Sequence, residues 1–267
     1  SDVCSSDLAA PIVVYCGWRA QCAWIVGMLV AYAMVMLWVP VPDVQGRVAA
    51  GALEPGRDVG AFIDRWLLDG HLWVKSKTWD PEGLLSTVPA LGTQLSGVLL
   101  GHWLVAKRDK AGQTVWMLLA GLLCLWVGAM LDVLVMPINK SLWSPSYVVF
   151  MAGWSLLVFA AFYWLIDANP SAGLRAHSQR WLLPFTIYGM NALFIFALSG
   201  FIAKMLGYIK LTQPDGTALA LKAVIYAPFK ALPLAPVNAS LLFAVLFNLC
   251  MFAVAWWMWR NKWFVKV

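Results

Sequence analysis

A series of long apolar runs constrains this chain more than any other feature. Each run is long enough to cross the roughly 30 Å hydrocarbon core of a lipid bilayer. Six of them lie at residues 21–41, 84–106, 114–136, 143–166, 181–206 and 240–259. Trp and Tyr stand at many of their ends, as in the aromatic belts of membrane proteins. The pattern predicts an all-α, polytopic transmembrane helix bundle of about six spans, with the lipid bilayer as its main partner.

Composition agrees with a membrane protein. Of the 267 residues, 62% are hydrophobic and 12% are charged, whereas soluble domains carry about a quarter charged residues. The net charge of +6 does not indicate nucleic-acid binding, because Lys and Arg stand at the ends of apolar runs and not among stacking aromatics. The five Cys form no CxxC pair, so they are interpreted as small apolar residues, and no metal site is expected.

The N-terminal residues predict a truncated chain. The sequence begins without Met, and residues 1–8 resemble a non-native peptide. Residues 9–17 look like the end of a helix whose beginning is absent. We therefore expect an N-terminal helix remnant, and a single transmembrane domain over residues 9–267.

The distribution of basic residues predicts the topology. Short segments on the side of Arg19 carry nine Lys and Arg, and positive charge in short loops marks the cytoplasmic side. The C-terminus is then cytoplasmic, and loops 42–82 and 207–238 face outward. In the first loop, residues 59–68 form an amphipathic piece with Asp64 and Arg65 on its polar face. In the second, residues 218–232 predict an interfacial helix containing Lys222 and Lys230.

The sequence Asp80-Pro81-Glu82-Gly83 stands at the mouth of the run at 84–106. Proline suits the first turn of a helix, so Asp80 can be an N-cap and Glu82 a first-turn acid. Alternatively, a carboxylate here acts as a general base or positions a substrate amine. Spacing alone leaves both interpretations open.

Other polar residues form a second set of candidates. Asn139, Lys140, Trp143 and Ser144 lie in a short connection on the same predicted side as Asp80. They either anchor and cap helices or hold a sugar or phosphate group. His71 is the single histidine on that side. Asn191 lies inside a span, where polar side chains form interhelical hydrogen bonds more often than they bind ligands.

Several blocks of this sequence resemble one known family. They are residues 61–68 (AFIDRWLL), 71–73 (HLW), 80–87 (DPEGLLST), 137–147, 189–192 (GMNA) and 260–267. Their order and spacing resemble the heparan-alpha-glucosaminide N-acetyltransferase family and its bacterial homologues. The resemblance runs from about residue 21 to the C-terminus.

The resemblance implies an acetyl-CoA-dependent N-acetyltransferase in a bacterial inner membrane. Cytoplasmic acetyl-CoA would donate the acetyl group to an amino sugar or cell-envelope glycan on the periplasmic side, and a homodimer stays open. The family's catalytic histidine is expected upstream of this chain, so the fragment alone is expected to be inactive. By motif position, the residues expected to line the substrate or cofactor pocket are Asp80, Glu82, Asn139, Lys140, Trp143, Ser144, Asn191 and His71.

Two other functions remain open at this stage. One is an amino-sugar transporter, against which the lack of broken-helix pairs in matching halves argues. The other is a membrane scaffold that has kept the family's architecture without its chemistry.

Overall fold

A computed structural model describes residues 2–74, 76–106, 109–212 and 218–265. The chain consists of two compact units, Ser1–Arg175 and Ala176–Val267, and each is described by itself. The single-domain expectation for residues 9–267 stays a prediction.

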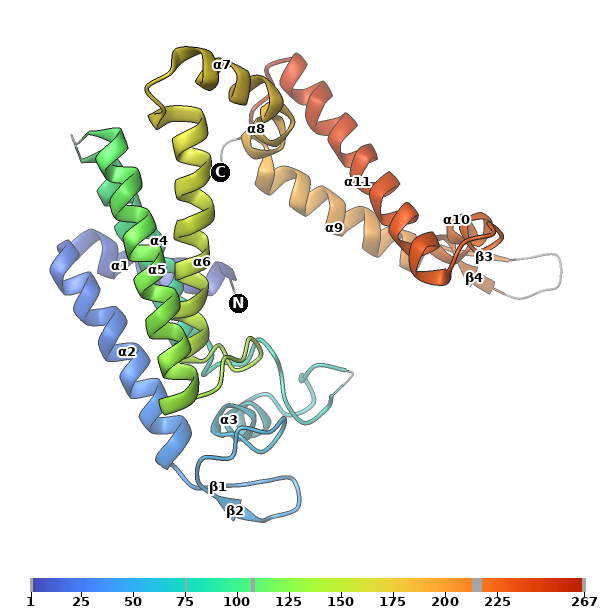
Figure 1. Cartoon of the computed structure of the whole chain (residues 1–267). Helices are drawn as coiled ribbons and strands as arrows, with labels where there is room; N and C mark the ends of the chain where they lie inside the picture. Colours follow the sequence, from blue (N-terminus) through green and yellow to red (C-terminus); the bar gives the residue numbers. More distant parts are fainter. Residues whose placement is uncertain (1, 75, 107–108, 213–217, 266–267) are drawn as a thin grey trace. The chain divides into compact units, whose positions relative to one another are not determined.

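Helices dominate both units (Figure 1). Unit 1 contains α1 (Asp2–Tyr15), α2 (Trp18–Trp38), α3 (Val59–Leu67), α4 (Thr87–Val105), α5 (Lys110–Leu134), α6 (Pro145–Tyr163), the π-helical turn η1 (Trp164–Ala168), and the short paired strands β1 (Val41–Pro42) and β2 (Val48–Ala49). Helix α7 (Ala172–Trp181) crosses the boundary between the units. Unit 2 contains α8 (Leu183–Met190), α9 (Ala192–Tyr208), the strand pair β3 (Lys210–Thr212) and β4 (Ala218–Ala220), α10 (Leu221–Lys230) and α11 (Pro236–Arg260).

The predicted all-α membrane bundle is confirmed, with a different number of spans. Four described segments are long and apolar enough to cross a membrane: α2, α5, α6 with η1, and α11. Helices α8 and α9 count as a fifth span if the pair, bent by 77°, is taken as one. The remaining predicted run, residues 84–106, corresponds to α4. This helix is shorter than the predicted run and carries the polar residues Thr93, Gln94, Ser96 and His102. It packs against α1, α2 and α6.

Helices α5 and α6 form the closest pair in unit 1, and glycine permits it. A Cβ added at Gly128 would lie 2.7 Å from the backbone nitrogen of Phe150, and one at Gly153 would lie 2.8 Å from the carbonyl oxygen of Gly121. Small residues allow membrane helices to approach in this way. The opposite side of α5 exposes Trp116, Leu119, Leu123, Trp126, Met130 and Val133, spaced as a lipid-facing stripe.

The buried side-chain amide of Gln113, near the start of α5, joins α5 to α4 and α6. The Gln113 amide nitrogen donates to the carbonyls of Trp103 and Ala106 at the end of α4, at 2.9 and 3.3 Å. Its oxygen accepts the Tyr163 hydroxyl of α6 at 3.0 Å. Every polar group of this side chain is therefore engaged, as burial in a membrane protein requires.

In unit 2 the bent pair α8 and α9 is broken at Asn191. Its amide donates to the carbonyl of Trp263 at 3.0 Å and accepts the N–H of Val265 at 2.9 Å. The side chain is buried, so the C-terminal tail satisfies it at the bend. One bent helix pair therefore occurs in the described residues, and the expected lack of broken-helix pairs in matching halves stays a prediction.

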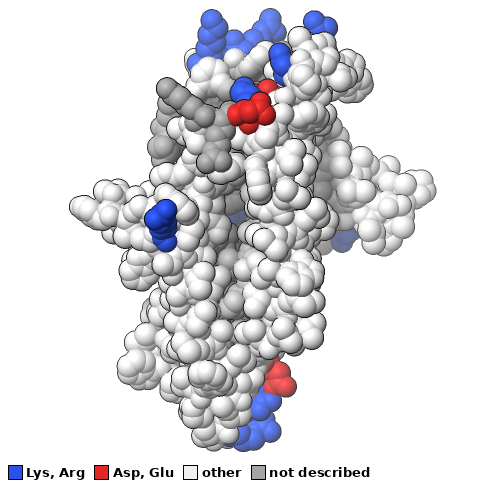
Figure 2. All heavy atoms as spheres, turned by 60° about the vertical axis from the view of Figure 1, so that its left-hand side comes forward, with Lys and Arg blue, Asp and Glu red and all other residues white. Residues whose placement is uncertain are grey.

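Most of the visible surface is uncharged, and Lys and Arg gather in separate groups (Figure 2). Because the spans expose many large apolar side chains, the chain is a multi-pass membrane protein that associates with the lipid bilayer.

Candidate functional site

The candidate site lies at the end of unit 1 where α2 ends and α6 begins (Figure 1). Two connections meet there. We call residues 39–86, between α2 and α4, the cap, and residues 135–144, between α5 and α6, the hairpin. The Tyr32 hydroxyl of α2 donates to the carbonyl of Leu142 in the hairpin. Tyr32, Val59 and Met136 share a buried apolar cluster, so α2, the cap and the hairpin pack as one structure.

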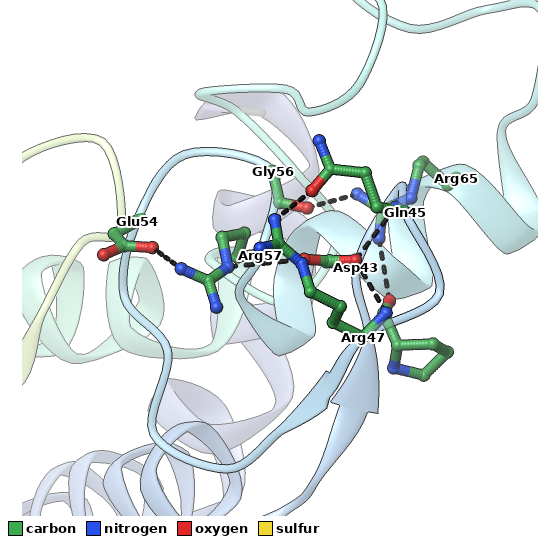
Figure 3. A network of polar contacts seen from close by, with 8 residues as sticks. Asp43, Gln45, Arg47, Glu54, Gly56, Arg57 and Arg65 are labelled. Carbon is green, nitrogen blue, oxygen red and sulfur yellow. Dashed lines mark hydrogen bonds and ion pairs between the residues drawn. The ribbon is translucent and has the colours of Figure 1, made fainter.

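Two charged side chains organise the cap (Figure 3). Asp43 accepts the backbone N–H groups of Gln45 and Arg47 at 2.8 and 2.9 Å. Its other oxygen lies 3.2 Å from Arg47 Nε and 3.5 Å from Arg57 Nε. The backbone N–H of Arg47 first, then that of Gln45 and the Arg47 guanidinium, hold the pKa of Asp43 below its usual value.

Arg65 is the second organising residue. Its guanidinium donates to the carbonyls of Gly56 at 2.7 Å, Thr78 at 3.0 Å and Pro42 at 3.3 Å. Because the planar guanidinium carries five N–H donors in fixed directions, it can bind three carbonyl groups from three parts of the same loop at once. Helix α3, which the sequence predicted as an amphipathic piece, is thereby fixed against the rest of the cap.

Three aspartates of the cap converge on a small cavity. Asp58, Asp64 and Asp80 line a space of about 20 Å³, which is room for about one water molecule. Tyr32, Gly60, Ala61, Trp79, Gly83, Ser86, Ser141 and Leu142 complete its wall. Within the described residues, no group of three or more His, Cys, Asp or Glu is arranged to hold a metal ion.

Local structure explains why two of these acids tolerate burial. Asp58 is 5% exposed and caps α3 by accepting the N–H of Ala61 at 2.9 Å. Asp64 is 1% exposed and accepts the N–H of Leu84 at 2.9 Å. Asp64 lies on the face of α3 that the sequence analysis identified as polar, and the structure shows that Asp64 is turned toward residues 80–86 and away from solvent.

Burial raises the pKa of both carboxyls. For Asp58, desolvation outweighs the hydrogen bonds from Ala61 and its neighbours that stabilise the anion. For Asp64, desolvation is again the largest cause, and the negative charges of Asp80 and Asp58 add to it. The Leu84 N–H and the Arg65 guanidinium act in the opposite direction. Proton-accepting carboxylates with raised pKa values are a frequent property of functional sites.

The Asp-Pro-Glu-Gly sequence does not begin a helix. Asp80 accepts the N–H of Glu82 at 2.9 Å, which closes a turn. Helix α4 starts only at Thr87, with Ser86 at the N-cap position. The predicted N-cap role of Asp80 is therefore wrong. Its side chain instead lines the cavity with Asp58 and Asp64.

The hairpin residues have mainly local partners. The Asn139 side chain accepts the N–H groups of Ser141 and Leu142 at 2.8 and 3.3 Å. The fully buried Ser144 hydroxyl donates to the carbonyl of Pro137 at 2.8 Å and accepts the N–H of Asn139 at 3.0 Å and that of Tyr147 at 3.3 Å. These bonds place Ser141 and Leu142 in the cavity wall. Lys140 is exposed.

Trp143 adopts a conformation unusual for a bulky residue. Its φ of 51° lies in the left-handed region, which costs of order 1–3 kcal/mol for a non-glycine residue. The indole Nε1 donates to Thr93 Oγ1 of α4 at 3.1 Å, and its ring makes an edge contact with Tyr147 at 5.5 Å. These contacts hold the ring between the hairpin and α4.

The structure brings together only part of the predicted pocket set. Asp80 meets the hairpin segment that Asn139 and Ser144 shape. His71 is exposed, and its Nδ1 lies 3.2 Å from the carbonyl oxygen of Asp69. Asn191 belongs to unit 2, where it binds the C-terminal tail. The pocket roles of all eight predicted residues stay predictions.

Sequence reasoning missed Tyr32, Asp58 and Asp64 as site residues. Asp58 had a usable signal, because an aspartate directly before an apolar-periodic segment predicts an N-cap. Tyr32 had none, since a tyrosine inside an apolar run has no distinguishing pattern.

Comparison with known proteins supports a distant relationship. No protein-family model matches the chain. The chain is 28% identical over 151 residues to heparan-alpha-glucosaminide N-acetyltransferase from Mus musculus and, equally, from Homo sapiens. Each match includes 51% of this chain and 22% of the relative, so the chain spans about a fifth of the length of the curated relatives it matches. The resemblance stated from sequence is confirmed as a distant similarity over about half of the chain.

Proposed function

We propose that this chain forms part of a membrane acyltransferase that moves an acetyl group from cytoplasmic acetyl-CoA to an amino sugar across a bacterial inner membrane. The distant similarity to two N-acetyltransferases and the membrane-spanning helices support the proposal. The cap would face the periplasm and form the acceptor side. The acceptor would be an amino sugar or a cell-envelope glycan carrying one.

The observation that carries the proposal is the carboxylate cluster at the meeting point of cap and hairpin. An amino sugar is an ammonium ion at neutral pH, and it must lose a proton before its nitrogen can attack. Asp80, which is partly exposed, is suited to attract that ammonium. Asp64 behind it has a raised pKa, which brings a carboxylate closer to the range of an efficient proton acceptor.

The reaction would proceed as general-base-assisted acyl transfer. The amine nitrogen forms a bond to the thioester carbonyl carbon, the carbon–sulfur bond breaks, and CoA leaves as a thiolate that takes up a proton. The proton lost by the amine passes to a base. The histidine expected upstream would relay the acetyl group or share the role of base with Asp64, while Asp80 holds and orients the acceptor.

An acetyl-transfer assay tests this proposal. Membranes containing the complete reading frame that encodes this sequence would be given radiolabelled acetyl-CoA and glucosamine. We expect Asp64→Asn to lower kcat/KM by about 10²-fold, the lower range for a general acid–base group, and Asp80→Asn to lower it by about 10²-fold because the acceptor is misplaced. Glu82→Gln and Asn139→Ala test the pocket roles assigned by motif.

Glu54→Gln is the matched control. Glu54 is an acid of the same cap, is 66% exposed and pairs with Arg57 away from the cavity. It should leave the rate unchanged. If Asp64→Asn and Asp80→Asn both keep wild-type rates, the acceptor side has been placed wrongly.

One observation favours a second candidate, an amino-sugar transporter. The break at Asn191 resembles the discontinuous helices that form transporter sites, and a cavity of about 470 Å³ lies beside it, with Ser199 and Asn248 in its wall. This candidate predicts that sealed vesicles accumulate labelled glucosamine without acetyl-CoA. Uptake that requires acetyl-CoA would reject it.

A further inference from the structure

Unit 2 carries far more positive than negative side chains. From residue 176 onward the sequence contains eight Lys and Arg and a single acid, Asp215, which lies outside the described residues. The described part of unit 2 therefore has no carboxylate to pair with Lys222 or Lys230. The excess of positive side chains in this unit favours an anion from outside the chain as a partner.

Lys222 lines an open groove of unit 2, and Lys230 lies about two helical turns further along α10. The groove encloses about 630 Å³, within the usual range for small-molecule sites. Its walls come from α9, α10 and α11, and they are mainly apolar: Ala203, Leu206, Gly207, Ala220, Ala223, Phe243, Ala244 and Phe247. Lys222, Tyr226 and Ser240 supply the polar groups of the lining.

An aromatic cluster fixes α10 against α11, and Figure 1 shows the short α10 next to the end of α11 at which α11 begins. Phe243 of α11 makes edge contacts with Tyr226 at 5.5 Å and with Phe229 at 5.4 Å. The Lys230 ammonium lies 5.6 Å from the centre of the Tyr226 ring. Lys222, Tyr226 and Lys230 follow one another in i, i+4 steps, so the two cations share one face of α10.

We infer that this groove binds an anionic phospholipid, with one acyl chain between α9 and α11 and the phosphate at Lys222 and Lys230. An acyl chain carries no polar groups to satisfy, whereas an extended peptide would bring unpaired backbone groups into an apolar groove. Helix α10 has the character of an interfacial helix with basic residues. The inference is independent of acetyl transfer.

Charge sets the expected selectivity. A lysine near an anionic membrane surface contributes about 1 kcal/mol, or about fivefold in affinity. Two lysines at one phosphate therefore predict a preference of about twentyfold for an anionic over a zwitterionic lipid with identical chains.

The test uses the full chain in phosphatidylcholine vesicles. A trace of lipid with a photoreactive diazirine in its acyl chain is added, as either phosphatidylglycerol or phosphatidylcholine, and labelled peptides are mapped by mass spectrometry. We expect phosphatidylglycerol to label the α9 and α11 peptides about twentyfold more than phosphatidylcholine. Lys222→Ala with Lys230→Ala should reduce labelling to the phosphatidylcholine level, and Lys222→Arg with Lys230→Arg should keep the preference. Lys110→Ala, at an exposed lysine of unit 1, is the control and should leave labelling of the groove unchanged.

A second variant tests the groove itself. Ala244→Trp fills the space between the helices and should abolish labelling at the groove by both probes without changing labelling of α5. Equal labelling by both probes, or strong labelling that survives Ala244→Trp, would overturn the inference. Crosslinks between two copies of the chain at α10, in place of lipid adducts, would also overturn it and assign the groove to a second copy.

Discussion

Asp64 accepts the backbone N–H of Leu84 at 2.9 Å, across twenty residues of sequence. This bond ties α3 to the segment that leads into α4. The other carboxylate oxygen lies so close to Gly83 that a Cβ at that position would overlap it. These two contacts fix Asp64 of α3 against Gly83 and against the segment that leads into α4.

Two substitutions of Asp64 distinguish the effect of its charge on stability from the effect of its hydrogen bond. Asp64→Asn keeps an acceptor for Leu84 and removes a buried negative charge, so we expect a higher melting temperature at neutral pH. Asp64→Ala leaves that N–H without its acceptor and should cost about 1–3 kcal/mol. Thermal unfolding in one detergent, followed by tryptophan fluorescence, measures both. An asparagine variant as unstable as the alanine variant would show that the charge itself stabilises the cap.

The buried acids predict an unusual dependence of stability on pH. Because Asp58 and Asp64 have raised pKa values when folded, the folded state binds more protons, and the free energy of unfolding falls as pH rises through those values. Acidification from neutral pH should therefore stabilise the cap. Asp43 has a pKa lowered from the ordinary 3.8, so its stabilising contribution is lost as pH falls through that lowered pKa. Melting temperatures across this range should pass through a maximum.

The double variant Asp58→Asn, Asp64→Asn checks the cause of that maximum. In this variant the melting temperature should rise less on acidification from neutral pH. The fall in melting temperature at lower pH, which Asp43 causes, should remain. A double variant with the wild-type profile would exclude these two carboxyls as its source.

Replacing Arg65 should lower the free energy of unfolding of the cap. Arg65→Lys keeps the charge, but one ammonium cannot reproduce the fork that serves Gly56, Thr78 and Pro42, so we expect a loss of about 1.5–3 kcal/mol. Arg47→Lys, at a residue whose side chain is 66% exposed, should cost much less. Hydrogen exchange at fixed pH should show faster exchange over residues 42–80 for the Arg65 variant. Equal exchange in both variants would contradict the organising role of Arg65.

The close approach of α5 and α6 should depend on Gly128. Gly128→Ala forces a Cβ against the backbone of Phe150, and we expect a cost of about 1–3 kcal/mol. Gly97→Ala, where nothing lies within 4 Å of an added Cβ, should be neutral or stabilising because alanine favours helix. Thermal stability in detergent compares the pair. A neutral Gly128 variant would show that the helices can separate without loss.

Helix positions were largely predictable, because apolar length decides them. The predicted interfacial piece at 218–232 corresponds to α10, and four predicted runs correspond to α2, α5, α6 and α11. Helix starts were less predictable. Pro81 suits a helix start and a turn equally, and the contact of Asp64 with Leu84, twenty residues apart, accompanies the turn.

The acid cluster was hidden from sequence for a similar reason. A polar position on a short amphipathic helix normally faces solvent, and only the folding of residues 80–86 over α3 buries Asp64. The break at Asn191 was equally invisible, since an apolar run reads the same whether its helix is straight or bent. Its partner lies 74 residues away at Val265.

The separation of 74 residues between Asn191 and Val265 determines when this contact can form during biosynthesis. While the ribosome is still making α9, α10 and α11, the Asn191 amide has neither the Trp263 carbonyl nor the Val265 N–H. The bend between α8 and α9 can therefore be locked only after residue 265 has emerged. Until then the segment can enter the translocon as an ordinary apolar stretch, and its final angle is set in the membrane after insertion.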